Sequence, residues 1–376
     1  MDFEGLLMIP GPVQLHERII KAMTRQMIPH RGKEFSKVIE YCTENLKPLF
    51  GTEGDAFTIS GSGTAGMEAA ISSFSGVNKM TCVDNGKFGE RLGLIAQRYT
   101  DVDHLRFDWG TSIELEEIER SLENGSEVVA FVHNETSAGI LNPAEEIAKL
   151  AKEHDALVIM DAITSVGGDE VKMDEWGVDV AVVGSQKCLG IPPGLAAVAV
   201  NEEAWNHYNE KCPFYLDLAA YRKKCEEYQT PFTPAEPLYF ALEESLKMIN
   251  EEGLDNRINR HRTFARAVRE WALAAGLELF PQLNDYSNYS NTVTAMKLPK
   301  DISDKDLRGT LSSEYNITVS GGQAELKGKI FRIGTMGNIG KKEVLATLSA
   351  VSDVLRRQGK NSDLALNAAT KVLEEL

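Results

Sequence analysis

Short apolar runs alternate with amphipathic stretches from about residue 56 of this chain. Apolar runs bounded by small or polar residues predict strands, and apolar positions that recur every three or four residues predict helices. The predicted strands are 56–60, 80–84, 104–107, 127–133, 156–161, 180–185 and 195–200. The predicted helices are 64–74, 86–99, 112–122 and 143–154.

Strands that alternate with helices are typical of a mostly parallel sheet that helices cover on both faces. The pattern therefore predicts an α/β fold. In such sheets ligands bind beyond the carboxyl ends of the strands. The residues that directly follow each predicted strand are accordingly the first candidates for chemistry.

The pattern changes after the last of these strands. The stretch YQTPFTPAEP at 228–237 is too rich in Pro and Thr for the interior of an element. The elements predicted beyond it are helices at 238–251, 254–275, near 303–313 and from 341, and strands at 292–298 and 329–334. They indicate a smaller α+β domain. We expect an N-terminal segment 1–15, a large domain 16–250 and a small C-terminal domain 251–376.

The helix predicted at 254–275 is rich in arginine. It carries Arg257, Arg260, Arg262, Arg266 and Arg269. Acidic residues surround these arginines, so the pattern favours a solvated face with salt bridges over an anion site.

The charge balance narrows the function classes. The chain has 40 Lys+Arg against 56 Asp+Glu, a net charge of −16, which would repel nucleic acid and anionic membrane surfaces. The five cysteines form no CxxC pair, the histidines form no spaced metal motif, and no apolar run is longer than a strand. We therefore expect a cytoplasmic protein with no metal site, no nucleic-acid partner and no membrane segment.

Three candidates for chemistry follow predicted strands. The turn at 60–64, SGSGT, opens a helix with glycines, hydroxyls and free N–H groups, which suits a phosphate but also a plain connection. Asp161 ends an apolar run, where a catalytic-edge carboxylate and a helix cap are equally good interpretations. Lys187 follows another run, where burial could lower its pKa, although surface lysines are more common.

The order and spacing of these groups change the odds. A phosphate cup, a post-strand Asp and a post-strand Lys 26 residues later form the order of a pyridoxal phosphate (PLP) site. The sequence resembles the class V PLP-dependent aminotransferases, in the branch of the alanine–glyoxylate and serine–pyruvate enzymes. The resembling segments are MIPGPVQL, SGSGTAGMEAAI, NGKFGER, HNETSAGILNP, VIMDAITSVGG, GSQKCLGIPPGLA and IFRIGTMG, in one order over nearly the whole chain. The resemblance implies the fold-type I architecture, a mostly parallel large domain plus a smaller α+β domain.

The resemblance assigns roles to the cofactor-binding residues. Lys187 would bind the cofactor covalently and move a proton as general base and acid, and Asp161 would pair with the pyridine nitrogen. The phosphate would be held by Ser62, Gly63 and Thr64, with Gln186 close by.

Four further roles follow from the same resemblance. Thr136 would bond the ring 3′-oxygen, and Phe88 would stack on the ring. Arg332 would bind the substrate α-carboxylate, a task suited to a planar guanidinium. Thr233 would reach the phosphate of a neighbouring subunit, but the match there is imperfect, which leaves Tyr228 and Thr230 open.

The family pattern implies a homodimer with shared active sites that transfers an amino group from alanine or serine to glyoxylate or pyruvate by a ping-pong mechanism. Arg31 could instead bind a second acidic group, as in an aspartate- or phosphoserine-type aminotransferase, or it could be a surface cap. A PLP-dependent lyase similar to cysteine desulfurases is a further alternative. It is weakened because Phe88 stands where those enzymes place His.

Overall fold

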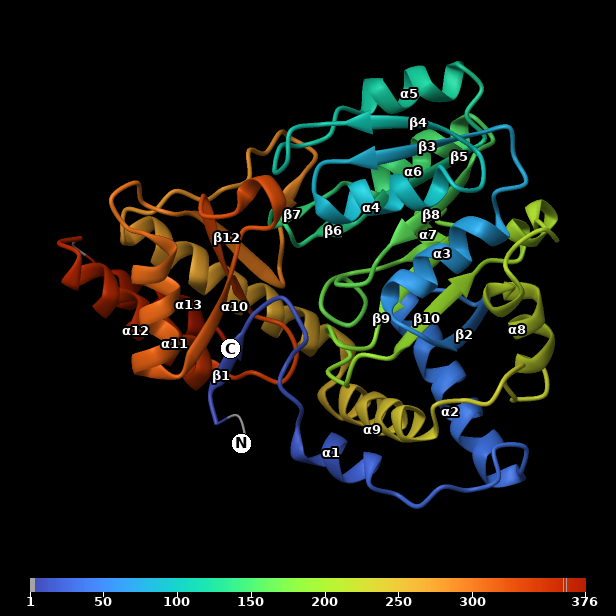
Figure 1. Ribbon diagram of the computed structural model, residues 1–376, viewed down its shortest axis with the longest axis horizontal. Coiled ribbons are helices and arrows are strands. Elements are labelled where there is room, and N and C mark those ends of the chain that lie inside the picture. Colours follow the sequence, from blue (N-terminus) through green and yellow to red (C-terminus); the bar gives the residue numbers. More distant parts are fainter. Residues whose placement is uncertain (1–3, 361, 363) are drawn as a thin grey trace.

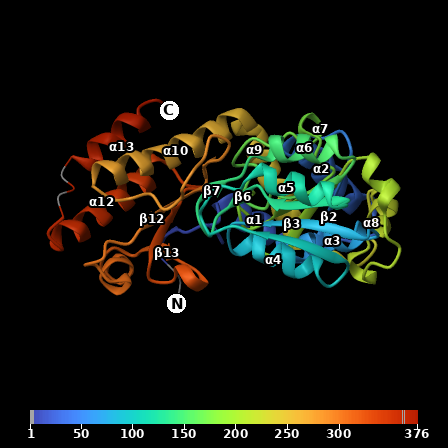
Figure 2. The ribbon, with the colours of Figure 1, turned by 90° about the horizontal axis from the view of Figure 1, so that it is seen from above.

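The computed structural model describes residues 4–360, 362 and 364–376. Figures 1 and 2 show two bodies side by side, a larger one formed mainly by the blue to yellow segments and a smaller one formed by the orange to red segments. No helix in the part of the chain described here is long and apolar enough to cross a membrane.

A seven-stranded sheet forms the centre of the larger body. In pairing order its strands are β2 (Asp55–Ser60), β10 (Leu195–Val200), β9 (Val180–Gly184), β8 (Leu157–Asp161), β5 (Val128–Val132), β3 (Lys79–Asp84) and β4 (Asp101–Arg106). Only β10 runs antiparallel to its neighbours β2 and β9. The carboxyl ends of the other six strands therefore lie at one edge, and the predicted mostly parallel sheet is confirmed.

Alternate residues of each strand supply two cores, because successive side chains point to opposite faces of a sheet. In β8, Val158 and Met160 join one core, whereas Leu157 and Ile159 join the other. The helices of the first core are α2 (Lys33–Phe50), α5 (Leu115–Glu123), α6 (Ala144–Glu153), α7 (Met173–Trp176) and α9 (Glu236–Glu252), with α1 (Glu17–Met23) against α9.

The second core lies under α3 (Gly63–Ser73), α4 (Lys87–Ala96) and α8 (Leu218–Cys225), together with the short 3-10 turn Glu203–His207. Figure 2 shows α3 and α4 on one face of the sheet and α5 and α6 on the other. The large sheet is thus covered on both faces, as an α/β fold requires.

The smaller body has its own four-stranded sheet and its own core. The strand order is β1 (Leu6–Met8), β13 (Ile317–Gly321), β14 (Ile330–Gly334) and β12 (Val293–Lys297). The helices are α10 (Leu254–Ala274), α11 (Thr310–Tyr315), α12 (Lys341–Arg357) and α13 (Ala365–Leu373). Strand β1 comes from the beginning of the chain and pairs in parallel with β13, so that Leu6 lies opposite Ile317.

A third, small sheet lies between the two large ones in space (Figure 1). It consists of β6 (Asn134–Glu135), β7 (Ile140–Leu141) and β11 (Asn288–Tyr289). Since β11 follows α10 in the chain and pairs with β7, this sheet connects the two bodies (Figure 1).

The predicted elements are confirmed with shifts of a few residues at their ends. The helix expected near 303–313 is a wide π-type turn, Lys305–Gly309, followed by α11. The interpretation of the arginine-rich helix as a solvated face is wrong for Arg257, which is 3% exposed. The division into 1–15, 16–250 and 251–376 stays a prediction.

Candidate active site

Three candidate groups meet at the carboxyl edge of the large sheet. Asp161 is the last residue of β8, Lys187 follows β9, and Ser62 follows β2. These three strands run in the same direction, because β10 is antiparallel to both β2 and β9, and β8 is parallel to β9. The register brings Asp161 opposite Val182, beside the start of the Lys187 loop.

A small cavity of about 20 Å³ lies at this edge. The residues that line it are Phe88, Val132, Asn134, Thr136, Asp161, Ile163, Thr164 and Lys187, and we call it the Lys187 cavity. Four of the predicted site residues, Lys187, Asp161, Thr136 and Phe88, therefore face one space. The ammonium nitrogen of Lys187 lies 6.0 Å from the centre of the Phe88 ring.

Lys187 is only 8% exposed, and its Nζ donates a hydrogen bond to the carbonyl of Pro10. Burial lowers the pKa of Lys187 to about 8, while the nearby Asp161 carboxylate acts in the opposite direction. The N-terminal segment covers this lysine closely. Gly11 has a φ of +85°, and a Cβ atom there would come within 2.7 Å of Lys187 Cδ, so the approach requires glycine.

Asp161 is 4% exposed, and its Oδ1 accepts a hydrogen bond from the Ile163 N–H at 2.8 Å. Burial raises the pKa of Asp161 to about 7, against the effect of that hydrogen bond. A carboxylate with this pKa gains strongly from a cationic hydrogen-bond donor placed in the cavity. A protonated pyridine nitrogen is such a donor.

The predicted phosphate cup lies at the start of α3. Ser62 is the N-cap residue and makes no side-chain capping bond within the described chain, so the helix N-terminus offers its N–H groups outward. A Cβ atom on Gly63 would lie 2.7 Å from Ile163 Cδ1, which holds this turn against the loop after Asp161. Thr64 Oγ1 accepts a hydrogen bond from Arg91 at 3.1 Å. The cup thus combines helix N–H groups, hydroxyls and a guanidinium, which suits an anion.

Gln186 lies next to the lysine. Its Oε1 is buried and has no hydrogen-bond partner among the residues described. A buried polar atom of this kind requires a partner that the protein chain does not supply.

Glu135 connects the Thr136 turn to the Phe88 helix. This fully buried carboxylate accepts hydrogen bonds from the N–H groups of Phe88 (2.9 Å) and Gly89 (3.0 Å), and from the N–H and hydroxyl of Ser137 (3.0 and 2.6 Å). Burial raises the pKa of Glu135, and these hydrogen bonds oppose the rise. The geometry fixes two cavity residues relative to each other, because Thr136 follows Glu135 directly.

Arg332, in the middle of β14, is 3% exposed and reaches the same turn from the smaller body. Its Nη1 donates to the carbonyl of Thr136 at 2.6 Å, and its Nε and Nη2 donate to the carbonyl of Gly321 at 3.1 and 2.8 Å. Burial lowers the pKa of Arg332 to about 10, still far above neutrality. The guanidinium therefore stays charged at the border between the two bodies.

Thr233 and its neighbours lie outside the Lys187 cavity. Thr233 is exposed, and the Thr230 hydroxyl is used locally, in a 2.7 Å hydrogen bond to the carbonyl of Phe232. The guanidinium of Arg31 bonds the carbonyls of Thr230 and Pro231 and the side chain of Gln229. Arg31 thus holds the segment that carries Thr233, which matches the capping interpretation rather than a second substrate group.

Sequence reasoning missed three contributors to this site. Arg91 lies within the NGKFGER segment but gives no local sign of its hydrogen bond to Thr64. Glu135 lies in the polar HNETS stretch, where nothing local distinguishes a buried carboxylate from an exposed one. The carbonyl of Pro10 depends on a contact between segments 177 residues apart, which no local pattern encodes.

The residues present fit PLP, because a buried acid, a lysine and an aromatic ring line one cavity, and the anion cup packs through Gly63 against Ile163 of the same cavity. The chain belongs to the aminotransferase class-V family, whose sequence model matches residues 13–336. Members of this class are fold-type I, PLP-dependent aminotransferases, and so is this protein.

Proteins with similar sequences match nearly the whole chain. An uncharacterized aminotransferase of Methanocaldococcus jannaschii is 45% identical over 94% of this chain and 93% of its own length. A protein of a Synechococcus strain named soluble hydrogenase, small subunit, is 36% identical over 99% of both chains. The serine–glyoxylate aminotransferase of Methylorubrum extorquens is 32% identical over 91% of this chain and 89% of its own.

Solved structures extend the likeness to three dimensions. The ureidoglycine–glyoxylate aminotransferase of Bacillus subtilis has a TM-score of 0.91 and 32% identity, over 100% of this chain and 99% of that one. An alanine–glyoxylate aminotransferase of a Nostoc species has a TM-score of 0.87 and 33% identity, over 94% and 95%. The predicted fold class and family are confirmed.

Proposed function

We propose that this aminotransferase moves an amino group from a small L-amino acid, alanine or serine, to glyoxylate or pyruvate by a ping-pong mechanism. The observation that carries the proposal is the Lys187 cavity, where a buried lysine and a buried acid face the same space. Relatives named serine–glyoxylate and alanine–glyoxylate aminotransferases support this choice of substrates.

The residues divide the work between binding and proton transfer. When bound, PLP supplies an electron sink for the negative charge left on the substrate Cα. Lys187 Nζ takes the proton from that Cα and later returns it, which suits an amine whose pKa is about 8. Asp161 holds the pyridine nitrogen in its protonated form.

The remaining residues orient the cofactor. Ser62, Gly63, Thr64 and Gln186 hold the phosphate. Phe88 covers one face of the ring, and the Thr136 hydroxyl binds the ring 3′-oxygen.

Arg332 binds the substrate α-carboxylate with its Nε–Nη2 edge, the edge with which arginine forms paired bonds to a carboxylate. That edge holds the carbonyl of Gly321 in this structure, so substrate must compete with a backbone carbonyl for it. A carboxylate competes well, because hydrogen bonds between two charged groups are stronger than those to a neutral carbonyl. Donors with a second acidic group lack the help of Arg31, whose guanidinium binds the Gln229 side chain and the Thr230 and Pro231 carbonyls.

We propose a cytoplasmic homodimer in which Thr233 of each subunit reaches the phosphate site of the other. Two observations support this arrangement: Thr233 is exposed, and the neighbouring Phe214 and Tyr215 are exposed aromatics that pack on Phe232. Tyr215 also donates to the carbonyl of Ser60 at the phosphate cup, so this surface adjoins the site. All five cysteines are free thiols, as in proteins of a reducing compartment.

A half-reaction tests the function. The PLP-loaded protein, freed of excess cofactor, is mixed separately with alanine, serine, aspartate, phosphoserine and cysteine without an acceptor. We expect alanine or serine to release one equivalent of 2-oxo acid per subunit and then stop, until glyoxylate or pyruvate restarts the release. Continuous release of sulfur from cysteine would instead identify a lyase, and release by aspartate or phosphoserine alone would change the donor.

A further inference from the structure

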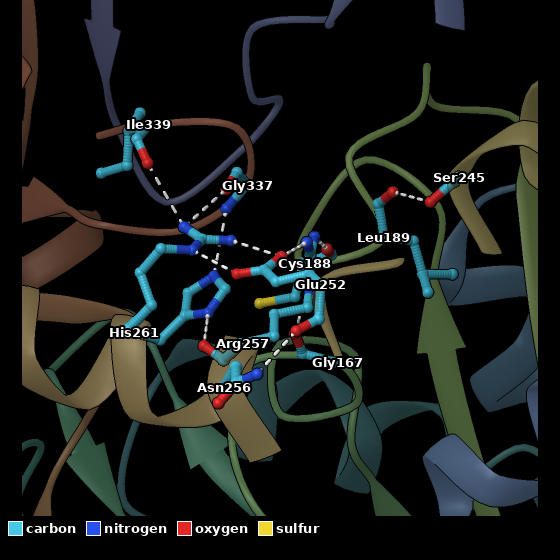
Figure 3. Close-up of polar contacts among 11 residues, drawn as sticks. Gly167, Cys188, Leu189, Ser245, Glu252, Asn256, Arg257, His261, Gly337 and Ile339 are labelled. Carbon is cyan, nitrogen blue, oxygen red and sulfur yellow. Dashed lines mark hydrogen bonds and ion pairs between the residues drawn. The ribbon is translucent and has the colours of Figure 1, made fainter. Parts of the chain in front are cut away.

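Arg257, on α10, contacts three separate segments of the chain (Figure 3). Its Nε donates to the carbonyl of Gly167 at 3.0 Å, its Nη2 to the carbonyl of Cys188 at 2.6 Å, and its Nη1 to Glu252 at 2.7 Å. The guanidinium is buried, so these bonds are sheltered from water. Each of its three nitrogens is engaged.

Two of these partners belong to the loops of the candidate active site. Cys188 is the residue after Lys187, and Gly167 lies in the loop that begins at Asp161. The loops touch, because a Cβ atom on Gly168 would come within 2.4 Å of Cys188 Sγ. Two carbonyls cannot hydrogen-bond each other, so a donor with fixed geometry must join them. The planar fork of arginine does this, whereas a lysine ammonium lacks that geometry.

The charge of Arg257 is balanced within a small cluster. Glu252, at the end of α9, also binds Arg260 at 2.6 Å, and the two arginines hold the pKa of Glu252 below its usual value despite its burial. We call Glu252, Arg257, Arg260 and His261 the Arg257 cluster. Two guanidinium groups share the one Glu252 carboxylate, and backbone carbonyls accept their other hydrogen bonds, so the cluster is held from several sides.

The Arg257 cluster also reaches the loop that follows the Arg332 strand. Arg260 donates to the carbonyls of Gly337 and Ile339 at 3.2 and 3.3 Å. His261 Nε2 accepts from the Gly337 N–H at 3.3 Å, and Nδ1 lies 2.8 Å from the carbonyl of Arg257. His261 is therefore neutral, with its proton on Nδ1, in line with a pKa far below the usual value in this buried position.

We propose that Arg257 is a positioning residue for the transamination: it ties the loops that follow Lys187 and Asp161 to helix α10, whose Arg260 and His261 hold the loop after the Arg332 strand. The proposal rests on the proposed function. Arg257 touches neither the Lys187 cavity nor any substrate group, and it acts only through the Gly167 and Cys188 carbonyls. Its effect is to keep the Lys187 amine at the height and angle at which it meets the substrate Cα.

The test compares Arg257→Lys and Arg257→Met with the wild type and with Arg262→Gln, an exposed arginine on the same helix. Lysine keeps the positive charge but cannot bridge both carbonyls. We expect Arg257→Lys to lower kcat for the alanine half-reaction about 10-fold, and Arg257→Met about 100-fold, with KM changed less than about threefold. The control should keep both constants.

Two further readouts separate positioning from folding. The visible absorption of the PLP-loaded protein is titrated against pH, and its midpoint should move by about half a unit or more in Arg257→Lys, because the Lys187 amine shifts relative to Asp161. PLP affinity of Arg257→Lys should stay near the wild-type value, whereas its Tm should fall because a buried carbonyl loses its donor. An unchanged titration and kcat with a lowered Tm would overturn the proposal and leave Arg257 a structural residue.

If the Arg257 variants fail to fold, Glu252→Gln is the variant that tests the proposal instead. This partly exposed carboxylate keeps its shape as an amide but no longer balances the two arginines. The expected shifts have the same direction and a smaller size, and a titration identical to wild type would count against the proposal.

The proposed function and the role of Arg257 can be refuted separately. A wild type that releases no 2-oxo acid refutes the proposed function, whereas the absorption titration still reports whether Arg257 positions Lys187.

Discussion

The Lys187 cavity and the Arg257 cluster both contain buried charged side chains, but these charges are paired in the cluster and face an open space in the cavity. In the Arg257 cluster the arginines share Glu252, and backbone carbonyls take the remaining donors. In the Lys187 cavity burial moves the pKa of the lysine down to about 8 and that of Asp161 up to about 7. Burial alone therefore does not identify a catalytic group. A buried group is a better catalytic candidate when its pKa lies near 7 and its side chain faces a cavity.

The largest effect is expected when the Lys187 amine is removed from the cavity. Lys187→Ala should lower kcat about 10,000-fold, since the covalent anchor and the proton carrier are lost together. Steady-state rates and the half-reaction measure this, with the exposed Lys342→Ala as control. PLP should still bind the variant, and a rate near that of the wild type would end the proposed mechanism.

The second test follows the acid through pH. The folded pKa of Asp161 is raised, from 3.8 to about 7, so its contribution to stability is complete below pH 4 and is lost as pH rises towards 7. The cofactor-free protein should lose roughly 4 kcal/mol of unfolding free energy across this window through Asp161. Denaturant unfolding at several pH values, compared with Asp161→Asn, checks it. If the unfolding free energy of both proteins depended on pH in the same way, the pKa assigned to Asp161 would be wrong.

Arg332 tests the border between the two regions. Arg332→Ala should raise KM about 10- to 100-fold for every α-amino acid, because the paired bonds to the α-carboxylate are lost. PLP binding should be unchanged, which an equilibrium titration of the cofactor-free protein measures. Loss of PLP would assign Arg332 a structural role instead. The exposed Arg356→Ala is the matched control.

The smallest expected effect concerns Glu135, a buried carboxylate next to the cavity residue Thr136, which resembles the Arg257 cluster in accepting several hydrogen bonds. Glu135→Gln places an amide N–H₂ group where backbone N–H groups now donate. PLP affinity should fall about 10-fold, since Phe88 and Thr136 lose their shared anchor. Fluorescence titration with PLP measures it, beside the exposed Glu146→Gln. Unchanged affinity would show that the Phe88 helix holds its place without Glu135.

Local sequence patterns were sufficient for the large sheet, whereas the centre of the site also required the order of its motifs and the resemblance to the class V family. Asp161 and Lys187 stand out because each follows an apolar run, and β8 and β9 lie side by side, as a parallel sheet predicts. Helix α2 has the same apolar periodicity as the predicted helices, with Phe35, Val38 and Ile39 on one face, but is not among the predicted elements. Strand β13 is not among the predicted elements, because its apolar pattern is short and turns adjoin it.

Long-range contacts account for the rest. Arg257 has the sequence context of a surface arginine, since nothing near it predicts carbonyls from residues 69 and 90 positions away. Arg91 and Pro10 are likewise defined by distant partners. Such residues become visible only when the fold brings the loops together.

The pairing of β1 with β13 has a consequence for the order of folding. Leu6 leaves the ribosome long before Ile317, so the first strand has no partner during most of synthesis. Contacts of such large sequence separation form late, because the chain must close a long loop first. Pro10 and Gly11, which closely follow β1, contact Lys187. Lys187 therefore gains its hydrogen bond to the Pro10 carbonyl only late in folding, when β1 has paired with β13.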